Sequence, residues 1–163
     1  VQEYPNNLHL HSPKPIVSVV LVTYQHVNFV EAAIKCVLNQ KTNVSYELII
    51  GDDQSTDGTR EICIDYATRY PDKIRLQLHT RENNISVLGT PCGIFQIAYN
   101  ILISRGNYLA LLSGDDEWTS DVKLQRQFDF LEENPAVAMT YLPFRERRRT
   151  ESGVTVRLCI RVD

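Results

Sequence analysis

The sequence predicts an α/β fold with a mostly parallel sheet and helices on both of its faces. β-branched and aliphatic runs alternate four times with segments of helical spacing, which is typical of strand–helix–strand units. The chain has 163 residues, 43% of them hydrophobic, so it is long enough for one domain with a substantial core. Its composition excludes the collagen-like, mucin-like and wholly disordered classes.

The predicted strands are short aliphatic runs between turn signals. The first, IVSVVLVT, is a near-continuous apolar run of the kind that is buried on both faces of a parallel sheet. The last follows the turn signal Glu151-Ser152-Gly153. Strands are expected at residues 16–23, 46–50, 74–78, 108–112, 136–141 and 154–160.

Four predicted helices lie between these strands. In the first, apolar residues recur at a spacing of three and four, and Asn28 can cap it. Thr56 or Asp57 can cap the second, and Pro71 marks its end. Pro91 stands where the first residue of the third helix is expected. The helices are expected at about residues 29–38, 59–70, 90–103 and 121–133.

The pattern divides the chain into three parts. Residues 1–15 contain three prolines and little periodicity, so we interpret them as a flexible N-terminal arm. Residues 16–141 form the predicted domain. Residues 142–163 form a basic tail or hairpin with six arginines, which is either a solvated strand pair or a patch that faces a lipid, a phosphate or an acidic partner.

Charge and cysteine content limit the partners and the compartment. A net charge of −3 argues against a nucleic-acid partner. No apolar run approaches the roughly 18 residues of a membrane span. The four cysteines are scattered without metal-site or redox-motif spacing, which favours reduced thiols and a cytoplasmic location.

Acidic residues follow two of the predicted strands, at the edge of the sheet where ligands bind in open α/β folds. Asp52 and Asp53 follow YELII, and Asp115 and Asp116 follow YLALL. Carboxylates gathered there repel one another unless a cation lies between them, and hard oxygen ligands suit Mg²⁺ or Mn²⁺. Asp52 and Asp53 can equally be turn residues, whereas the second pair, next to Gly114, favours a functional role.

Other candidate residues keep two interpretations. Tyr24 can stack on a base or pack at the sheet edge, and Trp118 can stack on a ligand or anchor the helix that follows it. His26 and His79 have no acidic or cysteine partner in a recognisable pattern, so we interpret both as structural. No glycine-rich dinucleotide fingerprint and no P-loop follows the first strand.

Three motifs in order, VSVVLVTY, DDQSTDGT and GNYLALLSGDD, resemble the family 2 glycosyltransferases over about residues 15–141. The resemblance implies the Rossmann-like GT-A fold. It also implies transfer with inversion from a nucleotide-diphosphate sugar, often a UDP-sugar, to a saccharide or lipid-linked acceptor in cell-surface polysaccharide synthesis. A peripheral contact of the full-length protein with the inner face of the membrane is left open.

The resemblance also assigns roles to residues. Thr23, Tyr24, Asp53 and Asp115 would contact the nucleotide, with Tyr24 against the base and Asp53 hydrogen-bonded to the uracil ring. Asp116, with Asp115, would hold Mn²⁺ or Mg²⁺. A divalent cation suits this reaction because negative charge grows on the leaving nucleoside diphosphate.

The sequence departs from the family in three places. Gln54 stands where glycine is common. Residues 81–88 have no clear A-R-N signature, and only Arg81 or Asn84 could contact the sugar. Family members continue into an acceptor-binding half that carries the general base, so we expect the chain to be a donor-binding portion truncated at its C-terminus, with the base beyond its end.

The residues leave one alternative function open and argue against two others. The first is a module that binds nucleotide-sugars without turnover. A receiver-like phosphoacceptor domain would need an acidic pair after the first strand, and a sugar nucleotidyltransferase would need a glycine-rich loop there. Val22-Thr23-Tyr24-Gln25 at that place fits neither.

Overall fold

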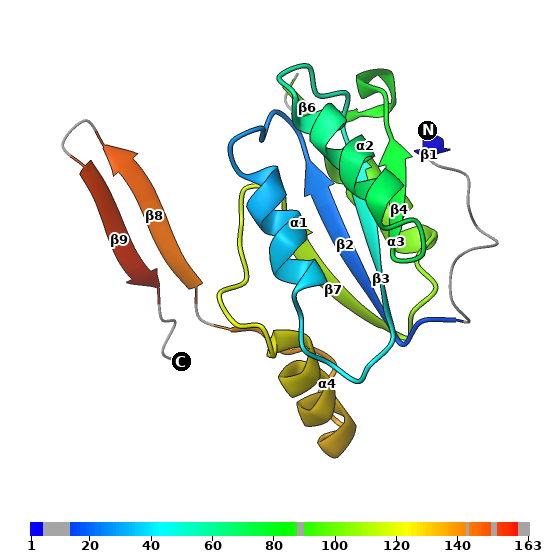
Figure 1. Ribbon diagram of the computed structural model, residues 1–163, viewed down its shortest axis with the longest axis vertical. Coiled ribbons are helices and arrows are strands. Elements are labelled where there is room, and N and C mark those ends of the chain that lie inside the picture. Colours follow the sequence, from blue (N-terminus) through cyan, green and yellow to red (C-terminus); the bar gives the residue numbers. More distant parts are fainter. Residues whose placement is uncertain (5–13, 88–89, 143, 151–152, 160–163) are drawn as a thin grey trace. The chain divides into compact units, whose positions relative to one another are not determined.

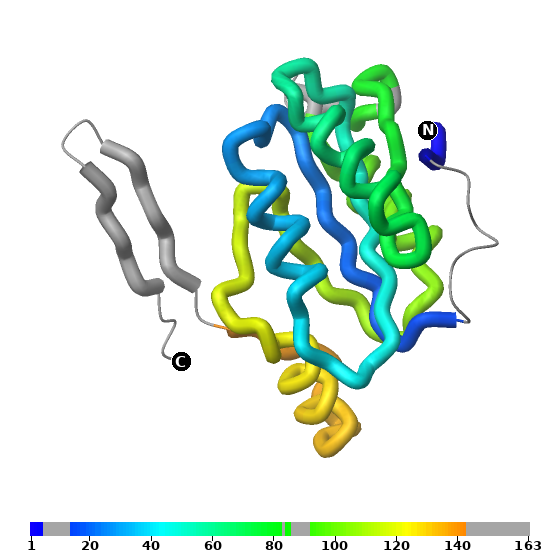
Figure 2. The backbone as a smooth tube through the Cα atoms, viewed as in Figure 1, coloured from blue at the N-terminus to red at the C-terminus, as the bar shows by residue number. Residues whose placement is uncertain are grey.

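The computed structural model describes residues 1–4, 14–87, 90–142, 144–150 and 153–159. The chain forms two compact units, Val1–Gln125 and Arg126–Asp163. Figure 2 follows the backbone of the first unit, which contains the sheet, and the second unit is described separately below. Among the described residues, no helix is both long and apolar enough to cross a membrane.

The first unit is built on a five-stranded sheet with the order β1-β4-β3-β2-β7. Strands β4, β3, β2 and β7 run parallel, and β1 pairs antiparallel with β4 at one edge. The arrowhead of β2 in Figure 1 marks the upper edge, where the carboxyl ends of the parallel strands lie. The strands are β1 (Gln2–Tyr4), β2 (Val17–Thr23), β3 (Tyr46–Asp52), β4 (Ile74–Leu78) and β7 (Tyr108–Ser113).

Helices cover both faces of this sheet, as the sequence predicts. Side chains alternate along β3, so Gly51 and Asp52 point to opposite faces. A Cβ at Gly51 would collide with Asn100 of α3, whereas the carboxylate of Asp52 binds Arg60 of α2. Helix α1 packs against α2 and β2, in front of the sheet in Figure 1. These helices are α1 (Val30–Leu38), α2 (Thr59–Arg69) and α3 (Ile94–Leu102), whereas α4 (Lys123–Glu133) begins at the end of the first unit and lies mostly in the second.

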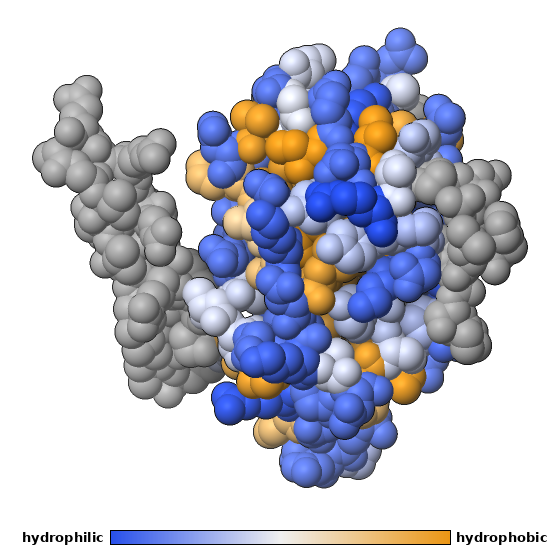
Figure 3. Space-filling model, viewed as in Figure 1, coloured by the Kyte–Doolittle hydropathy of each residue, from blue (hydrophilic) through white to orange (hydrophobic). Residues whose placement is uncertain are grey.

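The core lies between the sheet and these helices. The aliphatic side chains of the two central strands are almost wholly inaccessible to solvent, which fits their near-continuous apolar sequences. They include Val19, Leu21, Leu48, Ile49 and Ile50. The face of the first unit shown in Figure 3 is mostly hydrophilic, with hydrophobic side chains in small separate patches.

Three predicted elements differ in the structure. Residues 2–4, within the expected arm, form β1, because the edge of β4 offers them a pairing partner. The third helix begins at Ile94 and not at residue 90, since β6 (Thr90–Cys92) pairs with β5 (Ile85–Val87). Proline at position 91 therefore lies in a strand and not in the first turn of a helix.

The predicted strand at 136–141 is wrong. No described residue pairs with this segment, and a strand exists only through its ladder of hydrogen bonds. Its side chains Val137, Met139 and Tyr141 are exposed. The second unit instead contains a hairpin of β8 (Phe144–Thr150) and β9 (Gly153–Cys159), and β9 agrees with the predicted strand at 154–160 to within one residue.

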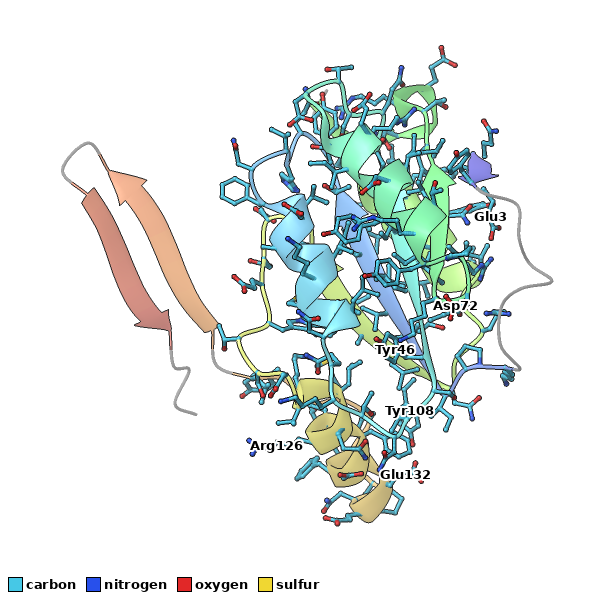
Figure 4. All side chains as sticks on the ribbon, viewed as in Figure 1. Glu3, Tyr46, Asp72, Tyr108, Arg126 and Glu132 are labelled. Atoms are coloured by element: carbon cyan, nitrogen blue, oxygen red, sulfur yellow. The ribbon has the colours of Figure 1, made fainter. Side chains whose placement is uncertain are left out.

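A buried charge cluster lies toward the amino ends of the strands, the end where the labelled Tyr46 and Tyr108 lie in Figure 4. Glu47 of β3 accepts hydrogen bonds from the Ser18 hydroxyl at 2.7 Å and from the Arg105 backbone N–H at 2.9 Å. The guanidinium groups of Arg105 and Arg75 lie 2.8 and 3.4 Å from the same carboxylate. This cluster joins β2, β3 and β4 to the segment between α3 and β7.

Candidate functional site

The carboxyl ends of three adjacent strands meet through Thr23. Its carbonyl accepts the N–H of Asp53 at 3.0 Å, and its hydroxyl lies 3.2 Å from Nδ1 of His26. Gly114 packs so closely on it that a Cβ at that position would lie 2.5 Å from Oγ1 of Thr23. Thr23 is almost fully buried, so it joins the ends of β2, β3 and β7 and has little surface left for a ligand.

Asp53 is the most constrained acid of the site. It is 2% exposed, and its Oδ2 accepts hydrogen bonds from Nη1 of Arg81 at 3.1 Å and from Nδ2 of Asn84 at 2.7 Å. Its Oδ1 is buried without a hydrogen-bond partner among the described residues. A buried acceptor without a partner costs stability, and such atoms often mark a place where a ligand or water supplies the donor.

The ring of Tyr24 is linked to this carboxylate through Arg81. The guanidinium carbon of Arg81 lies 4.0 Å from the centre of the ring, within the range of a cation–π contact. Arg81 therefore covers Tyr24 and binds Asp53 at the same time. Tyr24 stays 38% exposed, which leaves aromatic surface for a planar group.

Two loops are tied together beside the ring. The amide of Gln25 exchanges hydrogen bonds with Thr56, through Nε2 at 3.2 Å and Oε1 at 2.8 Å. Gln54 has a φ of 61°, in the left-handed region that favours glycine. That geometry explains why glycine is common there, and the Oε1 of Gln54 accepts the Arg81 N–H at 2.9 Å, a contact that glycine cannot make.

Asp52 and Asp57 support the turn. Asp52 is fully buried, and its Oδ2 accepts the Ser55 N–H at 3.2 Å and lies 2.5 Å from Nε of Arg60. Asp57 accepts the backbone N–H of Thr59 at 3.0 Å, where α2 begins. Both residues therefore stabilise the turn and the start of α2. This agrees with their interpretation from the sequence as turn and capping residues.

Asp115 and Asp116 follow β7 on the turn that starts at Gly114, and both are exposed. The Ser113 hydroxyl donates a short hydrogen bond to Asp115, and the Asp116 N–H donates to the Ser113 carbonyl at 3.1 Å. Partial desolvation and the neighbouring Asp115 carboxylate raise the pKa of Asp116, against a smaller lowering effect of His26. A nearby cation stabilises the charged form of a carboxylate whose pKa is raised in this way.

The acid pair fits a divalent cation that also binds a substrate. Among the described residues, no cluster of three or more histidine, cysteine, aspartate or glutamate side chains could hold a metal. Mg²⁺ and similar ions are often held by one or two carboxylates and complete their shell with water and substrate phosphates. The two exposed carboxylates, with the raised pKa of Asp116, suit that mode and do not suit a closed structural site.

The structure shows contacts at the site that the sequence did not predict. Arg81 and Asn84 were weak candidates for sugar contact, and they lie instead on Asp53. His26, interpreted from the sequence as structural, contacts Thr23 and lies close to Gly114. The contacts of Arg81 and Asn84 with Asp53 join positions 28 and 31 residues apart, and no local pattern encodes them. Trp118 contacts Lys123, the first residue of α4, at 4.1 Å from its ring.

The chain is similar to a known protein family and to several known proteins. The sequence profile described as Glycosyl transferase family 2 matches residues 18–155. An uncharacterized Mycobacterium tuberculosis protein, Rv1520, is 36% identical over 128 residues, which are 78% of this chain and 35% of that protein. The Bacillus subtilis minor teichoic acid biosynthesis protein GgaA is 28% identical over 140 residues, 83% of this chain and 29% of GgaA. The chain thus spans about a third of the length of these relatives.

Solved structures with this fold include complexes with nucleotide-sugars. S. aureus TarS with UDP-GlcNAc has a TM-score of 0.54 at 19% identity, over 73% of this chain and 32% of that one. The mannosyltransferase PcManGT from Pyrobaculum calidifontis, with GDP-Man and Mn²⁺, has a TM-score of 0.56 at 20% identity, over 74% and 33%. At such identities the likeness shows the fold alone, the Rossmann-like α/β architecture predicted from the sequence.

Proposed function

This chain belongs to glycosyl transferase family 2, and we propose that its first unit binds a nucleoside-diphosphate sugar, preferably a UDP-sugar, as the donor of a glycosyl transfer with inversion. The acceptor is proposed to be a saccharide or a lipid-linked saccharide of the cell surface. Its relative GgaA, named for teichoic acid biosynthesis, supports that setting.

The observation that carries the proposal is the buried, unpartnered Oδ1 of Asp53, whose carboxylate binds the same Arg81 that covers the ring of Tyr24. Uracil offers an N–H donor flanked by two carbonyl acceptors. Asp53 can accept that N–H, while Arg81 and Asn84, which already contact the other carboxylate oxygen, are donors for the carbonyls. Tyr24 can stack against the ring of the base. The structures of S. aureus TarS in complex with UDP and with UDP-GlcNAc support a uridine nucleotide in this fold.

Asp116 and Asp115 are the residues proposed to hold Mn²⁺ or Mg²⁺ on the diphosphate. Such a cation stabilises the negative charge that grows on the leaving group. Asp116, whose pKa is raised, is the proposed ligand, whereas Asp115 accepts a hydrogen bond from Ser113 and is held by it. Gly114, packed on Thr23, keeps the two carboxylates at the strand end that also carries the base site.

Calorimetric titration tests the donor site directly. UDP, UDP-GlcNAc, UDP-glucose and GDP are titrated into the protein with and without Mn²⁺. Uridine nucleotides are expected to bind in the micromolar to millimolar range, at least about tenfold more tightly with Mn²⁺ and about tenfold more tightly than GDP. Preference for GDP, or equal binding of both bases, would contradict the assignment of Asp53 to a uracil ring.

Asp53→Asn tests base recognition separately. Asparagine is close in shape, but its amide nitrogen can replace the acceptor that faces the uracil N–H, and it loses the charge that attracts Arg81. UDP affinity is expected to fall by about tenfold, and the preference for UDP over GDP is expected to disappear. The matched control is Asp65→Asn, an exposed acid of α2 that pairs with Arg69, which should leave both values unchanged.

A further inference from the structure

Residues 114–122, here named the acid loop, connect β7 to α4 and carry Asp115 and Asp116. The loop contains no helix or strand, and both acids are exposed. Its first residue is fixed on the sheet, because the Gly114 N–H donates to the Val22 carbonyl at 2.8 Å and Gly114 packs on Thr23. The remainder of the loop must be held by something other than the sheet.

Gln40, just after α1, binds the other end of the loop. Its Nε2 donates to the carbonyl of Ser120 at 2.8 Å and to that of Cys36 at 3.0 Å. Its Oε1 accepts the N–H of Leu124, in the first turn of α4, at 3.0 Å. Gln40 is only 8% exposed, and all three of its hydrogen bonds are to backbone groups. One buried amide therefore joins α1, the acid loop and α4.

Two further links lie beside it. The thiol of Cys36 accepts the Trp118 N–H at 3.3 Å, and the Lys41 N–H donates to the Asp121 carbonyl at 2.6 Å. Between these links, α1 and the loop do not pack closely. They enclose a half-open cavity of about 350 Å³, lined by Ala32, Lys35, Cys36 and Asn39 of the α1 segment and by Glu117, Trp118, Thr119 and Asp121 of the loop.

We propose that Gln40 is a positioning residue for the metal-binding acids, an inference that rests on the proposed function. The cavity lies between parts of α1 and the acid loop, so the path of the loop depends on its hydrogen bonds at Gly114, at Trp118 and at the start of α4. Gln40 supplies the bonds at the end away from the sheet. A preordered loop binds a cation more tightly because less conformational entropy is lost on binding.

Truncation of this amide leaves buried backbone groups without partners. In Gln40→Ala, the Ser120 carbonyl and the Leu124 N–H lose their partner, so the loop and the first turn of α4 gain freedom. Gln40→Glu keeps an acceptor for Leu124, but it places a carboxylate oxygen against the Ser120 carbonyl and loses that bond. Both variants are expected to weaken Mn²⁺ binding, and they differ in how they disturb the fold.

Trp118, the single tryptophan of the chain, reports on the acid loop directly. Its fluorescence is measured during titration with Mn²⁺ in the presence of UDP, and UDP binding without metal is measured by calorimetry. For Gln40→Ala and Gln40→Glu, we expect an about tenfold higher Mn²⁺ dissociation constant and greater quenching of Trp118 by acrylamide. Metal-free UDP binding should stay within about twofold, because the base site does not depend on Gln40.

Gln125→Ala is the matched control, since it truncates a second amide, whose Oε1 accepts hydrogen bonds from Thr42 and Asn43, two residues outside the acid loop. It should leave the Mn²⁺ constant unchanged. Far-UV circular dichroism identifies any variant that fails to fold, and a folded Gln40→Glu suffices if Gln40→Ala does not fold. An unchanged Mn²⁺ constant in a folded Gln40 variant would overturn the positioning role.

The two proposals fail in different ways. If the wild-type chain binds neither UDP nor Mn²⁺–UDP, the proposed function fails, and the role of Gln40 in metal binding fails with it. If the wild type binds Mn²⁺–UDP and the Gln40 variants bind it equally well, only the inference about Gln40 fails. If the variants lose metal-free UDP binding to the same extent as metal-dependent binding, Gln40 has a general structural role and no specific effect on the acids.

Discussion

An Asp116→Asn variant is expected to lose the metal-dependent part of nucleotide binding, with an Mn²⁺ dissociation constant raised at least about 100-fold. The amide oxygen of asparagine carries no formal charge, so the cation would keep a single carboxylate, Asp115, from the acid loop. That carboxylate already accepts a hydrogen bond from Ser113. The measurement is calorimetric titration of UDP with and without Mn²⁺, and UDP binding in the absence of metal should change little.

The neighbouring acid gives the control for this experiment. Glu117 follows Asp116 directly and is also exposed, so Glu117→Gln removes one charge from the same loop. It should lower Mn²⁺ affinity by less than about threefold through the reduced negative field alone. A large loss in Glu117→Gln together with a small loss in Asp116→Asn would show that the ligand has been assigned to the wrong residue.

Glu47→Ala is expected to destabilise the first unit by about 3–5 kcal/mol. Glu47 is 2% exposed and accepts from Ser18 and from the backbone and side chain of Arg105, while Arg75 lies beside it. Without the carboxylate, two partly or fully buried guanidinium groups lose a counter-ion, and the Ser18 hydroxyl loses its acceptor. The midpoint of urea denaturation, followed by circular dichroism, measures the change.

An exposed ion pair provides the comparison for Glu47. Glu31 pairs with Lys35 one turn along α1, and both side chains are more than half exposed. Glu31→Ala should leave the denaturation midpoint nearly unchanged, since solvent screens such pairs. Equal effects of Glu31→Ala and Glu47→Ala would show that the Glu47 cluster does not hold the strands together.

The stability contributed by Glu47 should depend on pH. Burial alone would raise the pKa of Glu47, but hydrogen bonds from Ser18 and Arg105 hold it below the usual value of 4.5. A lowered pKa in the folded state means that the contribution is fully present above about pH 4.5 and is lost as the pH falls below it. The wild type should therefore lose more stability than Glu47→Gln does between pH 5 and pH 3, in urea denaturation at each pH.

The architecture of the first unit was readable from local patterns. The apolar run before Thr23 and the 3–4 spacing of apolar residues in α1 identify a buried strand and an amphipathic helix from neighbouring residues alone. The same information failed for residues 136–141, where an apolar run has no partner strand among the described residues. It also failed at Pro91, because pairing with β5 overrides a local preference for a helix start.

The candidate site, too, was predictable from local sequence only in part. The acids were predictable, because Asp53 follows β3, Asp115 and Asp116 follow β7 after Gly114, and the sheet brings strand ends together. Their partners were not, because Arg81 and Gln40 contact residues 28 and 80 positions away. The residue-level roles in metal and base binding stay predictions until the titrations are made.

The sequence by itself determined the element types, the parallel core and the strand ends that carry acids, since each depends on periodicity and turn chemistry within about ten residues. Only the tertiary structure decided which oxygen of Asp53 is free, which cation covers Tyr24 and which amide holds the acid loop. Those features arise from contacts between segments distant along the chain, and their geometry follows from the packing of helices on the sheet. Local sequence fixes what each segment can form, and packing fixes which of its polar atoms remain available for a ligand.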